Sequence, residues 1–229
     1  MNKTRHIVLI NPNTSTATTA MMTDIARQAL PDHVSIAGMT ARTGVPMILD
    51  EMQLAAAAAG VIEMGLAASP VAHGIIVSAF GDPGVEQLRR LLDIPVIGIC
   101  EASMIEAATG GRRFGIATVT PQLVQSFSSK AEALGLGHLF AGTRLTDGDL
   151  RIVMSDAAEL RDRLAIAVEQ LFKHDGAEAV IIGGGPLGEA AIQLRQCFAA
   201  PVIAPIDAAA RFMTRQMEKV RSSIETHQV

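Results

Sequence analysis

Aromatic side chains are scarce in this sequence, which contains seven phenylalanines but no tryptophan and no tyrosine. Proteins that stack a large flat ligand use such side chains for that purpose, so we do not expect a large aromatic ligand. Cysteine is scarce too, since the chain has only Cys100 and Cys197. Their spacing matches neither a metal site nor a disulfide framework, and we expect both to be reduced thiols.

Long hydrophobic runs and clusters of positive charge are also missing. The longest unbroken apolar stretches, such as 54–62, fall well short of the roughly 20 residues that span a bilayer. The apolar run near the N-terminus stops at Asn11-Pro12, which is not the pattern of a signal peptide. A net charge of −4 without a basic cluster argues against nucleic acid or an anionic membrane as a partner. We expect a soluble, cytoplasmic protein.

The sequence does contain enough apolar residues for a large core, since 49% of its 229 residues are hydrophobic. Short runs rich in β-branched residues alternate with longer amphipathic stretches. This alternation predicts an α/β fold of βαβ units with parallel sheets and right-handed crossovers. We predict strands at 6–10, 34–39, 74–80, 95–100, 113–119, 179–185 and 201–206. We predict helices at 17–30, 51–70, 121–135, 155–174 and 187–198, and find no clear pattern at 136–150.

The second half of the chain repeats the spacing of the first. Ile76 and Val96 recur as Ile182 and Val202, at an offset of 106 residues. Any two βαβ lobes have similar spacing, but the match favours an internal duplication into two pseudo-symmetric lobes. Ligands of open α/β sheets bind at the carboxyl ends of the strands, so two facing lobes would share one cleft. The boundaries that we predict are 1–98 plus 207–229 for the first lobe and 99–206 for the second.

The predicted strand ends supply the candidates for this cleft. The first strand runs into "NPNTS" (11–15), where exposed N–H groups and a helix start can cradle an anion. A plain β-turn with a helix cap has the same pattern. Two later strands run into "FGDPG" (80–84) and "GGGPLGE" (183–189). Neither is a Walker loop or a dinucleotide fingerprint, so we do not expect a nucleotide.

These motifs carry a resemblance to a known family. "INPNTS", "RTGVP" (42–46), "FGDPG", "PVIGICEASM" (95–104), "GGGPLGEA" and "APVIAPIDAA" occur in the order seen in hydantoin and allantoin racemases of the aspartate/glutamate racemase superfamily. The resemblance covers nearly the whole chain. It implies two pseudo-symmetric α/β lobes with the active site between them, no cofactor, a small-molecule substrate and a homo-oligomer.

The sequence departs from the family where the chemistry occurs. The resemblance implies two catalytic cysteines, one per lobe, which remove and return the substrate's Cα proton from opposite faces. Ala79 and Gly184 occupy those positions here. Cys100 and Cys197 do not replace them, because Cys100 ends a different predicted strand and Cys197 lies in a helical pattern. Racemisation by two thiols is therefore not expected.

Three hypotheses remain open for the reaction. In the first, the pseudo-symmetric acids Glu101 and Asp207 replace the thiols as acid and base, although both residues also suit helix caps. In the second, the protein is a hydrolase or lyase of a thiohydantoin or cyclic imide, in which a carboxylate activates water. A divalent metal on Asp82, Glu101 and Asp207 is one form of that hypothesis. In the third, the protein binds a small molecule without catalysis.

Among these hypotheses we expect an enzyme of the hydantoin racemase type by family, acting in the cleft on a small cyclic amide or on a carboxylate derived from an amino acid. The candidate catalytic residues are Asp82, Glu101 and Asp207. The candidate binding residues are Asn11, Asn13, Thr14, Ser15, Phe80, Gly81, Thr118, Val119, Thr120, Gly184 and Gly185.

Overall fold

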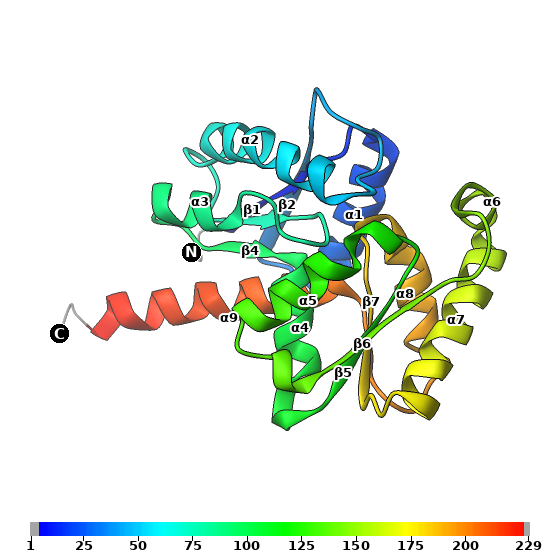
Figure 1. The fold of residues 1–229 in the computed structure, drawn as a ribbon. Coiled ribbons are helices and arrows are strands. Elements are labelled where there is room, and N and C mark those ends of the chain that lie inside the picture. Colours follow the sequence, from blue (N-terminus) through cyan, green and yellow to red (C-terminus); the bar gives the residue numbers. More distant parts are fainter. Residues whose placement is uncertain (1–4, 227–229) are drawn as a thin grey trace.

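Two parallel four-stranded sheets form the frame of the protein in a computed structural model, which describes residues 5–226 (Figure 1). The first sheet has the order β2-β1-β3-β4 and the second the order β6-β5-β7-β8, so the two have the same topology. The predicted α/β fold is confirmed. The strands are β1 (Arg5–Asn11), β2 (Val34–Thr40), β3 (Gly74–Val77), β4 (Val96–Gly98), β5 (Phe114–Thr118), β6 (Phe140–Leu145), β7 (Ala179–Ile182) and β8 (Val202–Ile203).

Helices cover both sheets. They are α1 (Thr16–Ala29), α2 (Glu51–Ala68), α3 (Val85–Leu91), α4 (Ile99–Ala107), α5 (Val124–Ala133), α6 (Leu150–Ser155), α7 (Ala157–His174), α8 (Gly188–Leu194) and α9 (Pro205–Thr226). Short 3-10 helices lie at η1 (Thr109–Gly111), η2 (Pro121–Leu123), η3 (Gly137–Leu139) and η4 (Gly185–Leu187).

Five of the predicted strands are shorter than expected, and two of these are followed closely by a helix. β4 stops at Gly98 and β8 at Ile203, so the runs predicted at 95–100 and 201–206 each continue into a helix. Periodicity alone cannot locate this change, because the first turn of α4 is as apolar as the strand before it. Helix α3 was not predicted, and the segment without a clear pattern contains β6.

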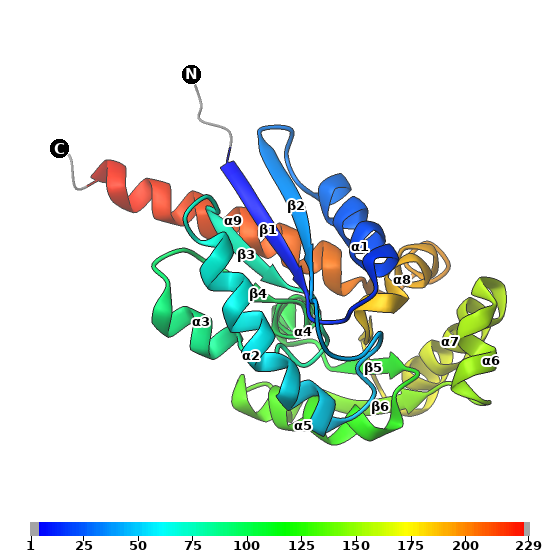
Figure 2. The same ribbon diagram turned by 90° about the horizontal axis from the view of Figure 1, so that it is seen from above.

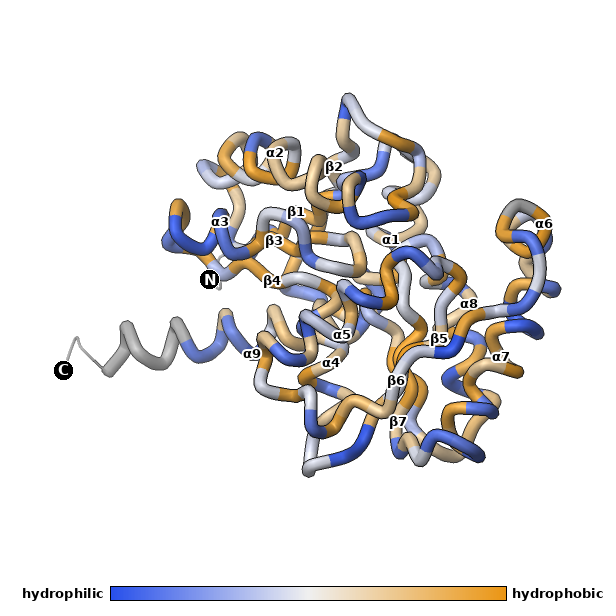
Figure 3. The backbone as a smooth tube through the Cα atoms, in the orientation of Figure 1, coloured by the Kyte–Doolittle hydropathy of each residue, from blue (hydrophilic) through white to orange (hydrophobic). Residues whose placement is uncertain are grey.

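Strands β1, β3 and β4 of the first sheet are buried on both faces, whereas the edge strand β2 is partly exposed. Val8 and Ile10 of β1 pack towards α2 and α3, whereas Ile7 and Leu9 pack towards α1 and α9. Burial on both faces explains the continuous apolar runs, which are typical of parallel sheets. Figure 3 shows these apolar strands inside and polar residues on α3 and α7 outside. None of the described helices is long and apolar enough to cross a membrane.

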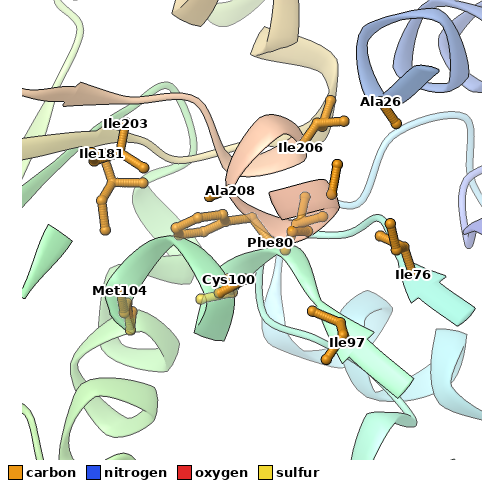
Figure 4. Packing of buried hydrophobic residues seen from close by; sticks show 14 of the residues in the cluster. Ala26, Ile76, Phe80, Ile97, Cys100, Met104, Ile181, Ile203, Ile206 and Ala208 are labelled. Carbon is orange, nitrogen blue, oxygen red and sulfur yellow. The ribbon is translucent and has the colours of Figure 1, made fainter. Parts of the chain in front are cut away.

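The last helix of each repeat packs on the sheet of the other repeat. Helix α4 follows β4 but contacts β7 and β8. Helix α9 follows β8 but contacts β3 and β4, beside which it runs in Figure 2. One buried cluster consequently includes residues of both sheets, among them Ile76, Ile97, Ile181 and Ile203 (Figure 4). Phe80 lies within this cluster, at the junction of the two sheets. The lobe boundaries at 98/99 and 206/207 stay a prediction. Residues 1–4 and 227–229, which this prediction assigns to the first lobe, lie outside the described residues.

The buried thiol of Cys100 makes stability sensitive to alkaline pH. Burial, together with the charge of Asp82, raises the pKa of this thiol well above its ordinary value. The folded chain therefore keeps the proton at a pH where the unfolded chain releases it. Stabilisation by the neutral thiol is complete below the pKa of the thiol in the unfolded chain, which is about 8.5. As the pH rises above that value, the free energy of unfolding decreases by up to about 1.4 kcal/mol per pH unit.

We expect the Cys100→Ala variant to lose this dependence. Its free energy of unfolding, measured in urea between about pH 7 and pH 10.5, should fall less steeply with pH than that of the unchanged protein. Cys197→Ala is the matched control, because Cys197 is exposed. Equal slopes for all three proteins would contradict this account of Cys100.

Candidate active site at the junction of the two sheets

A cavity lies where the carboxyl ends of the two sheets meet. The first half contributes Asn13, Met47, Ile48, Leu54, Ala79 and Phe80, and the second half contributes Val119, Thr120, Leu123, Phe127, Gly183, Gly184, Gly185, Pro186 and Leu187. Strand ends from both halves thus line one space, as the repeat predicts. The cavity volume is about 30 Å³. That is room for about two water molecules, so a ring-sized ligand has to widen it.

The turn after β1 is held by its own side chains. The buried Asn11 donates from Nδ2 to Thr19 Oγ1 (2.9 Å), and its Oδ1 accepts from the N–H of Asn13 (3.0 Å). Ser15 caps α1 by accepting from the N–H of Thr18, and the N–H of Thr14 donates to Val45 O. Of the candidates in this motif, Asn13 lines the cavity. Asn11, Thr14 and Ser15 shape the turn that presents it.

Asn13 also holds the loop that covers the cavity. Its Oδ1 accepts a hydrogen bond of 3.1 Å from the N–H of Ile48, which follows the "RTGVP" motif. Met47 and Ile48 are consequently placed over the cavity. The sequence analysis missed both residues, although their position directly after a motif shared with the family could have indicated them.

The corresponding strand end in the second half has a similar arrangement. Thr118 Oγ1 donates to Gly183 O (2.7 Å) and lies 3.1 Å from Thr120 Oγ1. Val119 and Thr120 line the cavity, whereas Thr118 lies one residue behind it. Thr118 therefore joins β5 to the glycine segment after β7, and Thr120 presents a hydroxyl to the ligand space.

The glycine segment brings the two strand ends together. A Cβ atom at Gly185 would lie 2.8 Å from Met22 Sδ and 3.0 Å from Ser78 O. Both contacts are tighter than an ordinary van der Waals contact, so a side chain at Gly185 would require Met22 and the Ser78 backbone to shift. Gly184 has φ +158°, and a Cβ there would lie 3.1 Å from Leu187 Cδ1. Ala79 and Gly184 both line the cavity.

Glu101 and Asp207 do not form an acid pair in the cavity, which corrects the first hypothesis. Glu101 is bound by Arg89, whose Nη1 lies 3.1 Å from Glu101 Oε2. Asp207 is bound by Arg195, at 2.5 Å between Nη1 and Oδ2, and by Arg211 at 3.7 Å. Neither carboxylate lines the cavity.

The internal repeat explains both ion pairs. Arg89 and Glu101 recur as Arg195 and Asp207 at the same offset of 106 residues. Arg89 lies in α3 and Arg195 directly follows α8, the helices before the two edge strands, and each acid lies in the first turn of the next helix. A negative charge there is favoured by the helix dipole. The pseudo-symmetry of the acids therefore reflects a repeated ion pair between an arginine and an acid. The sequence analysis identified the two acids but not the two arginines.

Asp82 lies behind the cavity as well. Its carboxylate accepts hydrogen bonds of 2.8 Å from the N–H groups of Cys100 and Glu101, at the start of α4. Lys130 Nζ lies 3.0 Å from the same carboxylate. Burial raises the pKa of Asp82, against the opposing effect of Lys130. Gly81 does not line the cavity.

The proposed metal set is not assembled in the structure. Lys130 occupies the space beside Asp82 and Glu101, at 3.0 and 3.6 Å, and Asp207 is bound to other partners. The described part of the chain contains no group of three side chains suited to a metal ion. None of the described residues that line the cavity has a titratable side chain. The cavity offers apolar surface, one amide, one hydroxyl and backbone groups.

Four apolar residues of the cavity wall were also missed: Leu54, Leu123, Phe127 and Leu187. Each belongs to an apolar helical pattern, which has the same appearance in sequence whether it faces a core or a ligand. Phe127 contacts Phe80 edge-on, with ring centroids 5.0 Å apart.

Comparison with known proteins agrees with the two-sheet frame. The sequence model of the family "Asp/Glu/Hydantoin racemase" matches residues 7–213. The chain belongs to this racemase family. It is 27% identical to a hydantoin racemase of Paenarthrobacter aurescens over 209 residues, which cover 90% of this chain and 88% of the relative.

Solved structures show the same relationship. An allantoin racemase from Klebsiella pneumoniae is 30% identical, with a TM-score of 0.86 and coverage of 92% of this chain and 86% of that one. An allantoin racemase from Pseudomonas fluorescens is 23% identical, with a TM-score of 0.87 and coverage of 93% and 91%, and shares the fold.

We expect Glu101→Gln and Asp207→Asn to affect stability and not the ligand site. Each substitution replaces a buried carboxylate by an amide, which binds the partner arginine less strongly. Weakening a buried interaction of this kind typically lowers the free energy of unfolding by about 1–3 kcal/mol. Urea unfolding measures this loss. Glu169→Gln is the control, because that acid forms an exposed pair with Lys173. A large change in ligand affinity or turnover at unchanged stability would restore the acids as catalytic candidates.

Proposed function

We propose that the cavity binds a small, neutral cyclic amide of the hydantoin type with an apolar substituent on its Cα. The observation that carries this proposal is the uncharged lining. Met47, Leu54, Phe80, Leu123 and Phe127 provide apolar walls. A free carboxylate in such surroundings needs a cationic partner, because burying an unpaired charge is costly. None of the described lining residues provides one, which favours the cyclic amide over an amino-acid-derived carboxylate.

Polar groups at the cavity suit the ring itself. Asn13 offers an amide, Thr120 a hydroxyl, and Gly185, the first residue of η4, a backbone N–H that the helix itself leaves without a partner. A hydantoin ring presents carbonyl oxygens and N–H groups in one plane. Such donors bind a ring carbonyl and also stabilise the negative charge that develops on it when the Cα proton is lost.

The reaction of the family's two thiols is absent from this proposal. Racemisation requires one group that removes a proton and another that returns it on the opposite face. Ala79 and Gly184 offer neither. We therefore propose a racemase-family cleft that binds its ring but lacks two-thiol proton exchange. Binding without two-base catalysis is favoured over hydrolysis because no carboxylate or metal-binding cluster of the described residues faces the ring.

Binding selectivity tests the first part of the proposal. We expect hydantoins with an apolar side chain, such as 5-isopropylhydantoin, to bind at least about tenfold more tightly than 5-carboxymethylhydantoin, since each buried CH₂ contributes about 0.8 kcal/mol. Isothermal titration calorimetry measures both affinities. Preference for the charged ligand, or no binding of either, would refute the assignment.

Deuterium exchange tests the second part. In D₂O, the protein should add little deuterium to Cα of a single hydantoin enantiomer above the uncatalysed background. The double variant Ala79→Cys/Gly184→Cys should exceed the unchanged protein by about 10²-fold or more, the usual contribution of an acid–base group. Each single variant should racemise far less, because one thiol acts on one face. Rapid exchange and racemisation by the unchanged protein would contradict the proposal.

The geometry of Gly184 calls for a companion variant. A cysteine there would press on Leu187 and adopt an unfavourable φ. Adding Leu187→Ala to the double variant relieves the contact. If neither cysteine variant gains exchange while both still bind the ligand, the assignment of the two thiol positions is wrong.

A further inference from the structure

The turn that carries position 79 has an unusual backbone. It consists of residues 79–84, follows β3 and contributes Ala79 and Phe80 to the cavity. Asp82 within it has φ +56°, and it is the one residue other than glycine with a positive φ among those described. Left-handed backbone is unfavourable for most side chains and persists where the surroundings impose it. The surroundings of Asp82 therefore determine where Ala79 and Phe80 lie.

Those surroundings come from two different elements. The start of α4 donates two N–H groups to the Asp82 carboxylate, and Lys130 of α5 binds it through an ammonium group. The Asp82 side chain is fully buried and that of Lys130 is 16% exposed. An ion pair in such a place is shielded from water, so loss of one partner has a large effect.

Helix α5 contacts the turn at a second point. Phe127, three residues before Lys130 and so on the same face of α5, packs edge-on against Phe80. Both phenylalanines line the cavity. Because α5 follows β5 of the second sheet while the turn follows β3 of the first, these two contacts join the two halves of the chain beside the cavity.

The other repeat makes the corresponding contact without charge. Offset by 106 residues, Asp82 corresponds to Gly188. Helix α1, which follows β1 as α5 follows β5, packs on this turn with Met21 and Ile25, the latter 2.8 Å from the position of a Cβ on Gly188. The fold therefore does not require an ion pair between the helix and the turn. The charged version occurs on the side of Ala79 only.

Lys130 also balances the charge of this region. Asp82 and Glu101 are both buried, and their partners are Lys130 and Arg89. Without Lys130, two neighbouring carboxylates would share one arginine. Repulsion between them favours movement of Asp82, and with it the turn.

We propose that Lys130 is a positioning residue of the ligand cavity: its ion pair with Asp82 holds α5 against the 79–84 turn and thereby controls how readily the cavity opens. The ligand assignment rests on the proposed function, but the positioning role does not. Since the closed cavity has room for about two water molecules, a ligand enters only when the walls separate, and the ion pair opposes that separation.

A thiol placed in the cavity reports this opening directly. Ala79→Cys introduces the thiol, and its rate of alkylation by iodoacetamide is followed by peptide mass spectrometry. Cys197, which is exposed, provides the reference rate in the same sample. A thiol in a closed cavity reacts only through local opening.

We expect Lys130→Met to raise the alkylation rate of the residue-79 thiol by about tenfold or more, in line with coupling between contacting groups. Asp82→Asn should also raise the alkylation rate. Lys130→Arg, which keeps the positive charge, should leave the rate within about threefold of that of the Ala79→Cys protein. Lys173→Met, which breaks an exposed pair on α7, is the matched control. All rates are compared at a temperature where circular dichroism shows native protein.

An unchanged rate in a folded Lys130→Met protein would overturn the proposal, as would equal acceleration by Lys130→Arg. If Lys130→Met does not fold, Lys130→Gln takes its place with the same criteria. Titration of 5-isopropylhydantoin into the same Lys130 variants, without Ala79→Cys, separates the two proposals. Failure of the unchanged protein to bind, together with a faster thiol reaction, refutes the ligand assignment and supports the role of Lys130.

Discussion

Close approach of two backbones is the constraint on which the site depends. A Cβ on Gly185 would lie only 3.0 Å from Ser78 O, so a side chain there would push the two backbones apart. This contact brings the strand ends of both sheets together, and the cavity and the shared apolar cluster follow from it. The absence of a side chain at Gly185 is thus a condition of the architecture, whereas the absence of a thiol at Ala79 and Gly184 concerns the chemistry. The small residue at position 185 is thus a matter of packing, whereas the small residues at positions 79 and 184 are a matter of chemistry.

Charge is arranged around the site and not inside it. The repeated pairs of Arg89 with Glu101 and of Arg195 with Asp207 hold the starts of α4 and α9. A carboxylate that already binds a guanidinium and lies outside the cavity is not available to take a proton from a ligand. The same buried acids that suggested catalysis in the sequence therefore stabilise the frame, and the cavity is left neutral.

Much of the fold could be predicted because parallel strands buried on both faces have a distinctive sequence pattern. The resemblance between the halves also placed Asn13, Ala79, Thr120 and Gly184 on one cavity. The remaining features depend on three-dimensional contacts. The partners of Glu101 cannot be known until α3 is placed. Phe127 has the pattern of any core residue, and only the folded structure shows that it faces a cavity.

The exchange of last helices between the repeats has a consequence for the origin of the chain. Because α4 covers the second sheet and α9 the first, one repeat on its own would leave a sheet face bare. An ancestor of half this length would have needed a second copy to supply the missing helix, as in a domain-swapped dimer. Gene fusion would then have joined the two copies, after which each half was free to change independently. Asp82 and Gly188, at corresponding positions, are one difference between the halves.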